Sequence, residues 1–115
     1  SLLSVNETEA AFYGDRLHAQ GALVAVSLGA EGAVLYRAGK EVVREAPPKV
    51  RVVDTVGAGD TFTAALTVAL IEGMTEQAAL RFAVTAGALA CTRPGAQPSL
   101  PHRADVDRLI QETWR

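Results

Sequence analysis

Two glycines, an alanine and an aspartate between two apolar segments carry the clearest chemical signal of this sequence. Gly57, Ala58 and Gly59 are small enough for backbone N–H groups to approach a ligand closely. They open an apolar helix, whose first amides lack intrahelical acceptors and whose dipole is positive at that end. Asp60 follows in the first turn, where its carboxylate could accept a proton from an attacking hydroxyl group. The pattern indicates a phosphate-binding anion hole beside a general base.

A simpler interpretation of the same residues remains open, because aspartate also caps helices and glycines also make tight turns. Two other phosphate-binding loops do not fit. A P-loop would need a lysine directly after the glycines, and none is present. A dinucleotide-binding fingerprint would need a third glycine where Phe62 stands.

The composition limits the size and the partners of the protein. The chain has 115 residues, of which 49% are hydrophobic, so it is one domain or a piece of one. The net charge of -2 and the scattered basic residues disfavour nucleic acid and anionic membranes as partners. No apolar run reaches the ~20 residues of a membrane span, and a cytoplasmic location is expected. Cys91 is the only cysteine and is predicted to be a buried core thiol.

Apolar runs predict the strands that position this turn. Residues 22–28 form a continuous apolar run, typical of a strand buried on both faces of a parallel sheet. Further strands are predicted at residues 2–3, in a hairpin of residues 33–36 and 42–44, and at residues 50–53 directly before the glycine turn.

Three helices follow from residue 59 onwards. They are predicted at residues 59–72, from a Thr75 cap to about residue 92, and at residues 104–113. The prolines of residues 93–101 exclude regular structure there.

A short helix follows Asn6, and the whole connection from Val5 to Ala22 has only about 16 residues, near the ~10–12 residue minimum of a parallel crossover. Either the connection is abridged or residues between Gly14 and Leu17 are missing.

Four motifs in order resemble the ribokinase (PfkB-type carbohydrate kinase) family. Residues 6–9 (NETE) resemble its NxxE motif, residues 27–32 its [ST]-x-G-x-x-G loop, and residues 54–60 its DTxGAGD signature. Residues 92–99 (TRPGAQPS) are similar to the TRxGAQPS segment of ribokinases proper. The resemblance implies the C-terminal part of a three-layer α/β/α fold with a mostly parallel sheet. Residues 1–115 would form its nucleotide-binding portion, and the N-terminal sugar-binding and lid part would be absent.

The resemblance also implies roles for individual residues. Asp60 matches the catalytic base, and Gly57, Ala58 and Gly59 match the anion hole. The residues implied to bind the nucleotide are Asn6, Ser27, Gly29, Gly32, Gly59 and Asp60.

Two cation sites are implied in the same way. Asn6 and Glu9 match residues that organise Mg²⁺ and phosphates, largely through water, which suits a hard cation. The alternative is a helix cap with a solvated acid. Asp54 matches a carboxylate beside a K⁺ site, whose shell would be completed by the backbone carbonyls of Val56, Ala90, Arg93 and Gly95 and by the Ser99 region. The alternative there is a rigid loop that binds no ion.

The implied function is ATP-dependent phosphorylation of a sugar hydroxyl, with D-ribose favoured by the TRPGAQPS segment. The chain alone is expected to be inactive, and the full-length protein to be a homodimer. Alternatives are a non-catalytic nucleotide-binding fragment, a structural fragment that dimerises through its exposed sheet, or a kinase for fructose, ketodeoxygluconate or a nucleoside.

Overall fold

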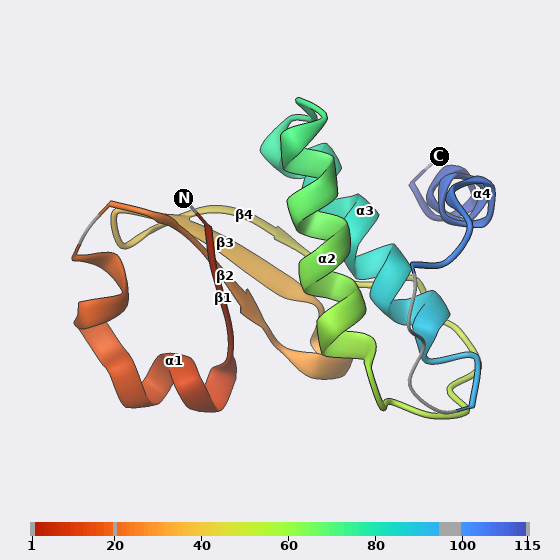
Figure 1. Cartoon of the computed structure of the whole chain (residues 1–115), viewed down its shortest axis with the longest axis horizontal. Coiled ribbons are helices and arrows are strands. Elements are labelled where there is room, and N and C mark those ends of the chain that lie inside the picture. Colours follow the sequence, from red (N-terminus) through yellow and green to blue (C-terminus); the bar gives the residue numbers. More distant parts are fainter. Residues whose placement is uncertain (1, 20, 95–99, 115) are drawn as a thin grey trace.

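A computed structural model describes residues 2–19, 21–94 and 100–114 of the chain (Figure 1). In sequence order its elements are β1 (Leu2–Asn6), α1 (Glu7–Tyr13), the 3₁₀ turn η1 (Gly14–His18), β2 (Leu23–Ser27), the 3₁₀ turn η2 (Gly29–Glu31), β3 (Ala33–Arg37), β4 (Lys40–Glu45), α2 (Ala58–Ile71), α3 (Glu76–Ala90) and α4 (Arg103–Thr113). The predicted α/β class is confirmed.

The described strands form one sheet of four strands in the order β1-β2-β3-β4. β1 and β2 are parallel, with Leu2 opposite Leu23, whereas β2, β3 and β4 are antiparallel neighbours. The predicted hairpin is therefore present, and its two strands extend further towards each other than expected. This portion of the sheet is mixed, because only the β1–β2 pair uses a helical crossover.

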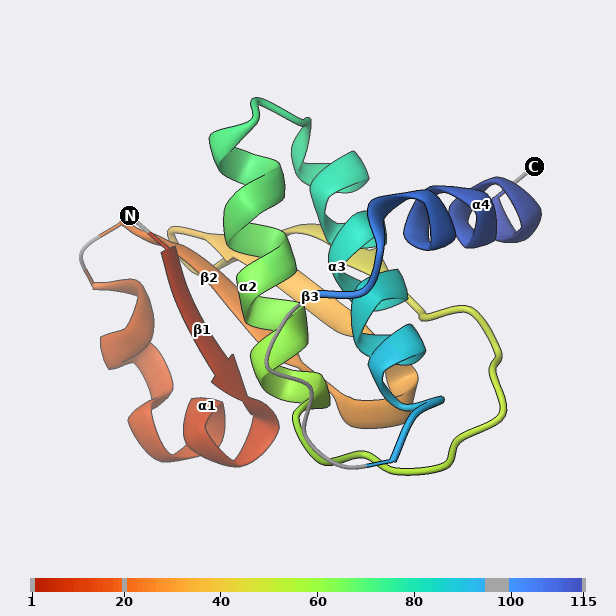
Figure 2. The ribbon, with the colours of Figure 1, turned by 45° about the vertical axis from the view of Figure 1, so that its right-hand side comes forward.

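Alternating side chains divide the sheet between two helical layers. On one face, Leu23, Ala25 and Leu35 join the buried core beneath α2 and α3. On the other face, Val24 and Val34 are also buried, on the side of the sheet where α1 contacts β1 and β2 (Figure 2). β2 is thus covered on both faces, as its continuous apolar sequence predicts.

Small residues allow α2 and α3 to pack closely. Ala65, Ala69, Ala79 and Ala83 are fully buried in the core between these helices. α3 begins at the predicted cap, because the Thr75 hydroxyl accepts the backbone N–H of Ala78. The closely packed helix pair therefore holds the turn before α2 and the residues after α3 in place.

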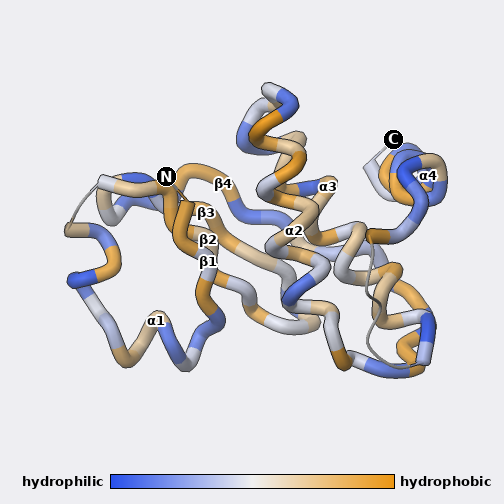
Figure 3. The backbone as a smooth tube through the Cα atoms, viewed as in Figure 1, coloured by the Kyte–Doolittle hydropathy of each residue, from blue (hydrophilic) through white to orange (hydrophobic). Residues whose placement is uncertain are grey.

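The last helix, α4, is anchored against α3 and the end of α2. Val106 is buried, and Arg103 pairs with Glu72 through two hydrogen bonds of 3.0 and 2.7 Å. The Arg103 guanidinium also lies 4.8 Å from the centre of the Phe82 ring. Figure 3 shows apolar residues along much of the strands, whereas polar and apolar residues alternate on α1 and α4.

The prediction of a strand at residues 50–53 is wrong. The segment between β4 and α2 is irregular, and Val52 and Val53 are 60% and 55% exposed. The backbone N–H groups of Val53 and Asp54 both donate to the carbonyl of Cys91, at 2.7 and 3.0 Å. The segment consequently follows the end of α3 rather than a neighbouring strand.

The short crossover is accommodated by α1 of seven residues followed directly by η1. Of the helices that the structure describes, none has the length and apolar character to cross a membrane.

Candidate active site

A tight turn sets the start of α2. The carboxylate of Asp54 accepts the N–H of Val56 at 2.9 Å, and the N–H of Ala58 donates to the carbonyl of Thr55 at 3.2 Å. Gly57 has φ 81° and ψ -5°, the geometry of the third residue of a type II turn. A side chain is strongly disfavoured in this left-handed conformation, so a glycine is required here.

The amides after this turn are the donors of the predicted anion hole. Ala58 uses its N–H within the turn, and Thr61 donates to the carbonyl of Gly57 at 3.0 Å. Within residues 2–19, 21–94 and 100–114, the N–H groups of Gly57, Gly59 and Asp60 have no acceptor. Three of the four amides from Gly57 to Asp60 are therefore available to a ligand, and that of Ala58 is engaged in this conformation.

Asp60 is exposed at the first turn of α2. One turn further on, the hydroxyl of Thr63 lies 2.9 Å from that of Ser4 in β1. The end of β1 therefore lies beside the start of α2, at the same edge as the end of β2 (Figures 1 and 2). Ligands of α/β proteins bind at this carboxyl edge of parallel strands.

Asn6 and Glu9 form a capping box at the start of α1. The Asn6 side chain accepts the N–H of Glu9 at 2.8 Å, and the Glu9 carboxylate accepts the N–H of Asn6 at 3.0 Å. Both residues are exposed, and the Ser4–Thr63 contact brings β1, which ends at Asn6, against the first turns of α2. The capping interpretation is thus satisfied, and the exposed oxygens remain at the edge where a ligand would sit.

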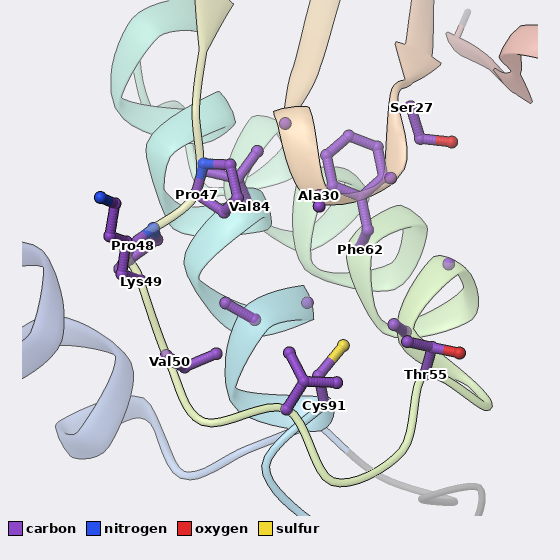
Figure 4. A pocket seen from close by; sticks show the side chains of 17 residues that line it. Ser27, Ala30, Pro47, Pro48, Lys49, Val50, Thr55, Phe62, Val84 and Cys91 are labelled. Atoms are coloured by element: carbon purple, nitrogen blue, oxygen red, sulfur yellow. The ribbon is translucent and has the colours of Figure 1, made fainter.

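A cavity of about 610 Å³ opens beside the amide cluster. Its size lies within the range of small-molecule sites. Three segments form its walls: η2 and its flanks, the irregular segment after β4, and the end of α3 with the start of α2 (Figure 4). Ser27, Gly29, Gly32 and Gly59, four of the residues predicted to bind a nucleotide, line it.

Most of the cavity wall was not predicted. The lining residues that sequence reasoning missed are Pro47, Pro48, Lys49, Val50, Val52, Phe62, Val84, Gly87, Ala88 and Cys91. A signal existed on α3, because small residues at positions 84, 87, 88 and 91 share one helical face. The other wall depends on how the chain after β4 folds back, which no local pattern reports.

Cys91 is half-buried and lines this cavity, so it is not the core thiol that was predicted. Figure 4 shows its sulfur directed into the cavity. Burial, and to a smaller extent the nearby charge of Asp54, raise the pKa of this thiol above its usual range. The thiol therefore remains protonated at neutral pH.

The segments of the predicted K⁺ site are brought together in part. The Cys91 carbonyl ties residues 53 and 54 to the end of α3, which places the Asp54 backbone beside that end of the helix. The Ala90 carbonyl accepts the N–H of Arg93 at 3.4 Å. Gly95 and Ser99, also predicted for this site, lie outside the described residues.

Among the residues that the structure describes, no three His, Cys, Asp or Glu side chains gather as a metal-binding group.

The family model for the pfkB family of carbohydrate kinases matches residues 2–103. The chain belongs to this family. It is 44% identical over 115 residues to the ribokinase of Bacillus subtilis, in a match that covers 94% of this chain and 39% of the relative.

Solved structures agree with this family assignment. The ribokinase of Arabidopsis thaliana, complexed with ribose and ATP, is 37% identical with a TM-score of 0.85, covering 96% of this chain and 41% of that one. An Escherichia coli protein assigned as a ribokinase II, in complex with ATP and Mg²⁺, is 28% identical with a TM-score of 0.85, covering 96% and 39%. The pfkB-family chain thus spans about two fifths of the length of these relatives.

Proposed function

We propose that this chain is the ATP-binding and catalytic-base portion of a sugar kinase that phosphorylates D-ribose to ribose 5-phosphate. One observation carries the proposal. The open amides of Gly57, Gly59 and Asp60 lie beside a cavity in the size range of small-molecule sites, with an exposed carboxylate at the same helix turn.

The proposed reaction divides between these parts. The cavity holds the base and sugar of ATP, and the amides at the start of α2 bind the phosphoryl group as negative charge develops on it. The Asp60 carboxylate takes the proton of the attacking primary hydroxyl. The new O–P bond forms as the bond between the β–γ bridging oxygen and the γ-phosphorus breaks, and ADP leaves with that electron pair.

Mg²⁺ suits the donors present here. Asn6 and Glu9 offer exposed oxygens at the carboxyl end of β1, which are the ligand type that this hard cation prefers. When bound, the ion neutralises charge on the phosphates of ATP. Asp54 and the carbonyls of Val56, Ala90 and Arg93 are proposed for K⁺, whose role would be to brace the turn from behind.

Ribose is favoured by the TRPGAQPS segment and by the identity to the ribokinase of Bacillus subtilis. Other pfkB-type substrates, such as fructose, ketodeoxygluconate or a nucleoside, remain alternatives, because the sugar-binding residues are not among the motifs of this chain. A cytoplasmic homodimer is proposed for the whole protein.

Calorimetric titration with ATP tests the nucleotide site, and a coupled ADP-release assay of the whole protein with each sugar tests the activity. We expect ATP binding and the highest turnover with ribose. ATP binding without turnover for any sugar would favour the non-catalytic alternative. Failure to bind ATP would reject the proposal.

A further inference from the structure

A partly buried ion pair lies where the cavity wall leaves the sheet: the Arg81 side chain is 32% exposed and that of Glu45 is 10% exposed. Glu45 is the last residue of β4. One carboxylate oxygen accepts hydrogen bonds from Arg81 Nε at 2.9 Å and from Gln77 Nε2 at 3.3 Å, both on α3. A carboxylate with so little contact with water depends on such donors, because an unpaired buried charge is strongly unfavourable.

The arginine of this pair is itself held from the far side. Its guanidinium carbon lies 5.1 Å from the centre of the Trp114 ring, which packs against the core just after α4. This cation–π distance restricts where the guanidinium can lie. The ion pair therefore joins the end of β4 to α3 and to the end of α4.

Both irregular walls of the cavity meet at the backbone of Glu45. A Cβ atom added to Gly32 would lie 2.0 Å from the Glu45 carbonyl oxygen, so the η2 wall lies directly against this residue. On the other side, residues 47–50 follow Glu45 after a single residue and form the opposite wall. A shift of Glu45 would move both walls relative to α3.

We infer that Glu45 and Arg81 are positioning residues that fix the cavity walls against α3 and thereby set the affinity for the nucleoside part of the nucleotide. The inference rests on the proposed function for the identity of the ligand. It assigns no role to the pair at the phosphates, because the amides of Gly57, Gly59 and Asp60 lie at the N-cap and first turn of α2.

Arg81→Met is the decisive variant, because it leaves the Glu45 carboxylate buried with Gln77 as its remaining described donor. Arg44→Met is the matched control. Arg44 lies on the same strand and pairs with Glu41 at 3.0 Å, but both side chains are about half exposed. Breaking such an exposed pair has little effect.

Two measurements separate a positioning role from an effect on general stability: ligand affinity and the alkylation rate of Cys91. In the 115-residue chain, Arg81→Met should raise the dissociation constant of ATP about tenfold and leave that of inorganic tripolyphosphate unchanged. Arg44→Met should change neither. Glu45→Gln keeps the shape of the side chain, so its dissociation constant for ATP should lie between those of Arg81→Met and Arg44→Met.

The second probe does not depend on nucleotide binding. Cys91 lines the cavity and is the only cysteine of the chain, so its alkylation rate reports how far the walls open. We expect faster alkylation in Arg81→Met than in Arg44→Met, at a temperature where circular dichroism shows both variants folded. If Arg81→Met misfolds, the same comparison is made with Glu45→Gln and Glu41→Gln.

The outcomes distinguish this inference from the proposed function. If the unaltered chain fails to bind ATP, the proposed function fails, and the alkylation rates still decide whether the pair holds the walls. Equal alkylation rates in variant and control, or a parallel loss of ATP and tripolyphosphate affinity, would overturn the inference.

Discussion

At the scale of single residues, Asp60 and the glycines before it have separable roles. Asp60 presents an exposed carboxylate, Gly57 makes the turn possible through its positive φ, and Gly59 leaves open space. The glycine turn and the exposed carboxylate at its end could be predicted from the sequence, because each depends on a local backbone feature. The engagement of the Ala58 amide by Thr55 could not, since it depends on which turn type forms.

We predict that Asp60→Asn lowers turnover of the whole protein by at least ~100-fold, because it removes a general base and preserves the shape of the side chain. Turnover is measured by coupled ADP release, with the affinity for ATP as the control. Near-normal turnover would show that Asp60 is not the base.

Gly59→Ala tests whether the open space at this position belongs to a ligand. An added Cβ would meet no atom within 4 Å, and the backbone is helical, so alanine should raise helix stability by about 0.5–1 kcal/mol. We predict that the same change weakens ATP binding, because the methyl group would enter the space in front of the amides. A variant that is more stable and binds ATP normally would contradict this prediction.

At the scale of elements, the capping box of α1, the hairpin and the helices from residue 58 onwards match their sequence signals. The segment at residues 50–53 does not, although its valines are typical of a strand. Its amides bond to the end of α3 instead of a strand. The Glu45–Arg81 contact was missed for a related reason, because it joins residues 36 positions apart.

The loop around Asp54 leads to a prediction about monovalent cations. If K⁺ binds between Asp54 and the end of α3, replacing K⁺ by tetramethylammonium should depress turnover of the whole protein, because that cation is too large for carbonyl ligands. The assay is run at constant ionic strength to remove general salt effects. Indifference to the exchange would favour the alternative of a rigid loop that binds no ion.

At the scale of the whole molecule, the described part of the chain exposes several large apolar side chains and the edge of strand β1. β1 is an edge strand, and Leu3, Phe12 and Ile71 are 43%, 73% and 80% exposed. Unpaired strand edges and exposed apolar side chains both favour association. The three-layer arrangement could be predicted from the motifs, whereas the size of the open surface depends on the tertiary structure.

We predict that the 115-residue chain has no sugar kinase activity alone, because it spans only about two fifths of the length of the ribokinases that it resembles. The coupled assay with ribose should show no ADP release above the rate without ribose. Light scattering under the same conditions reports whether the chain associates. Ribose-dependent turnover by this polypeptide would refute the prediction.

The amides at the start of α2 have a consequence for mutational mapping. Because an N–H group belongs to the main chain, replacing the side chains of residues 57–60 deletes none of these donors unless proline is introduced. An alanine scan would therefore not measure these donors directly, because Gly57→Ala and Gly59→Ala act through backbone strain and an added methyl group. Only chemical synthesis that exchanges single amides for esters would reveal how much of the rate depends on each donor.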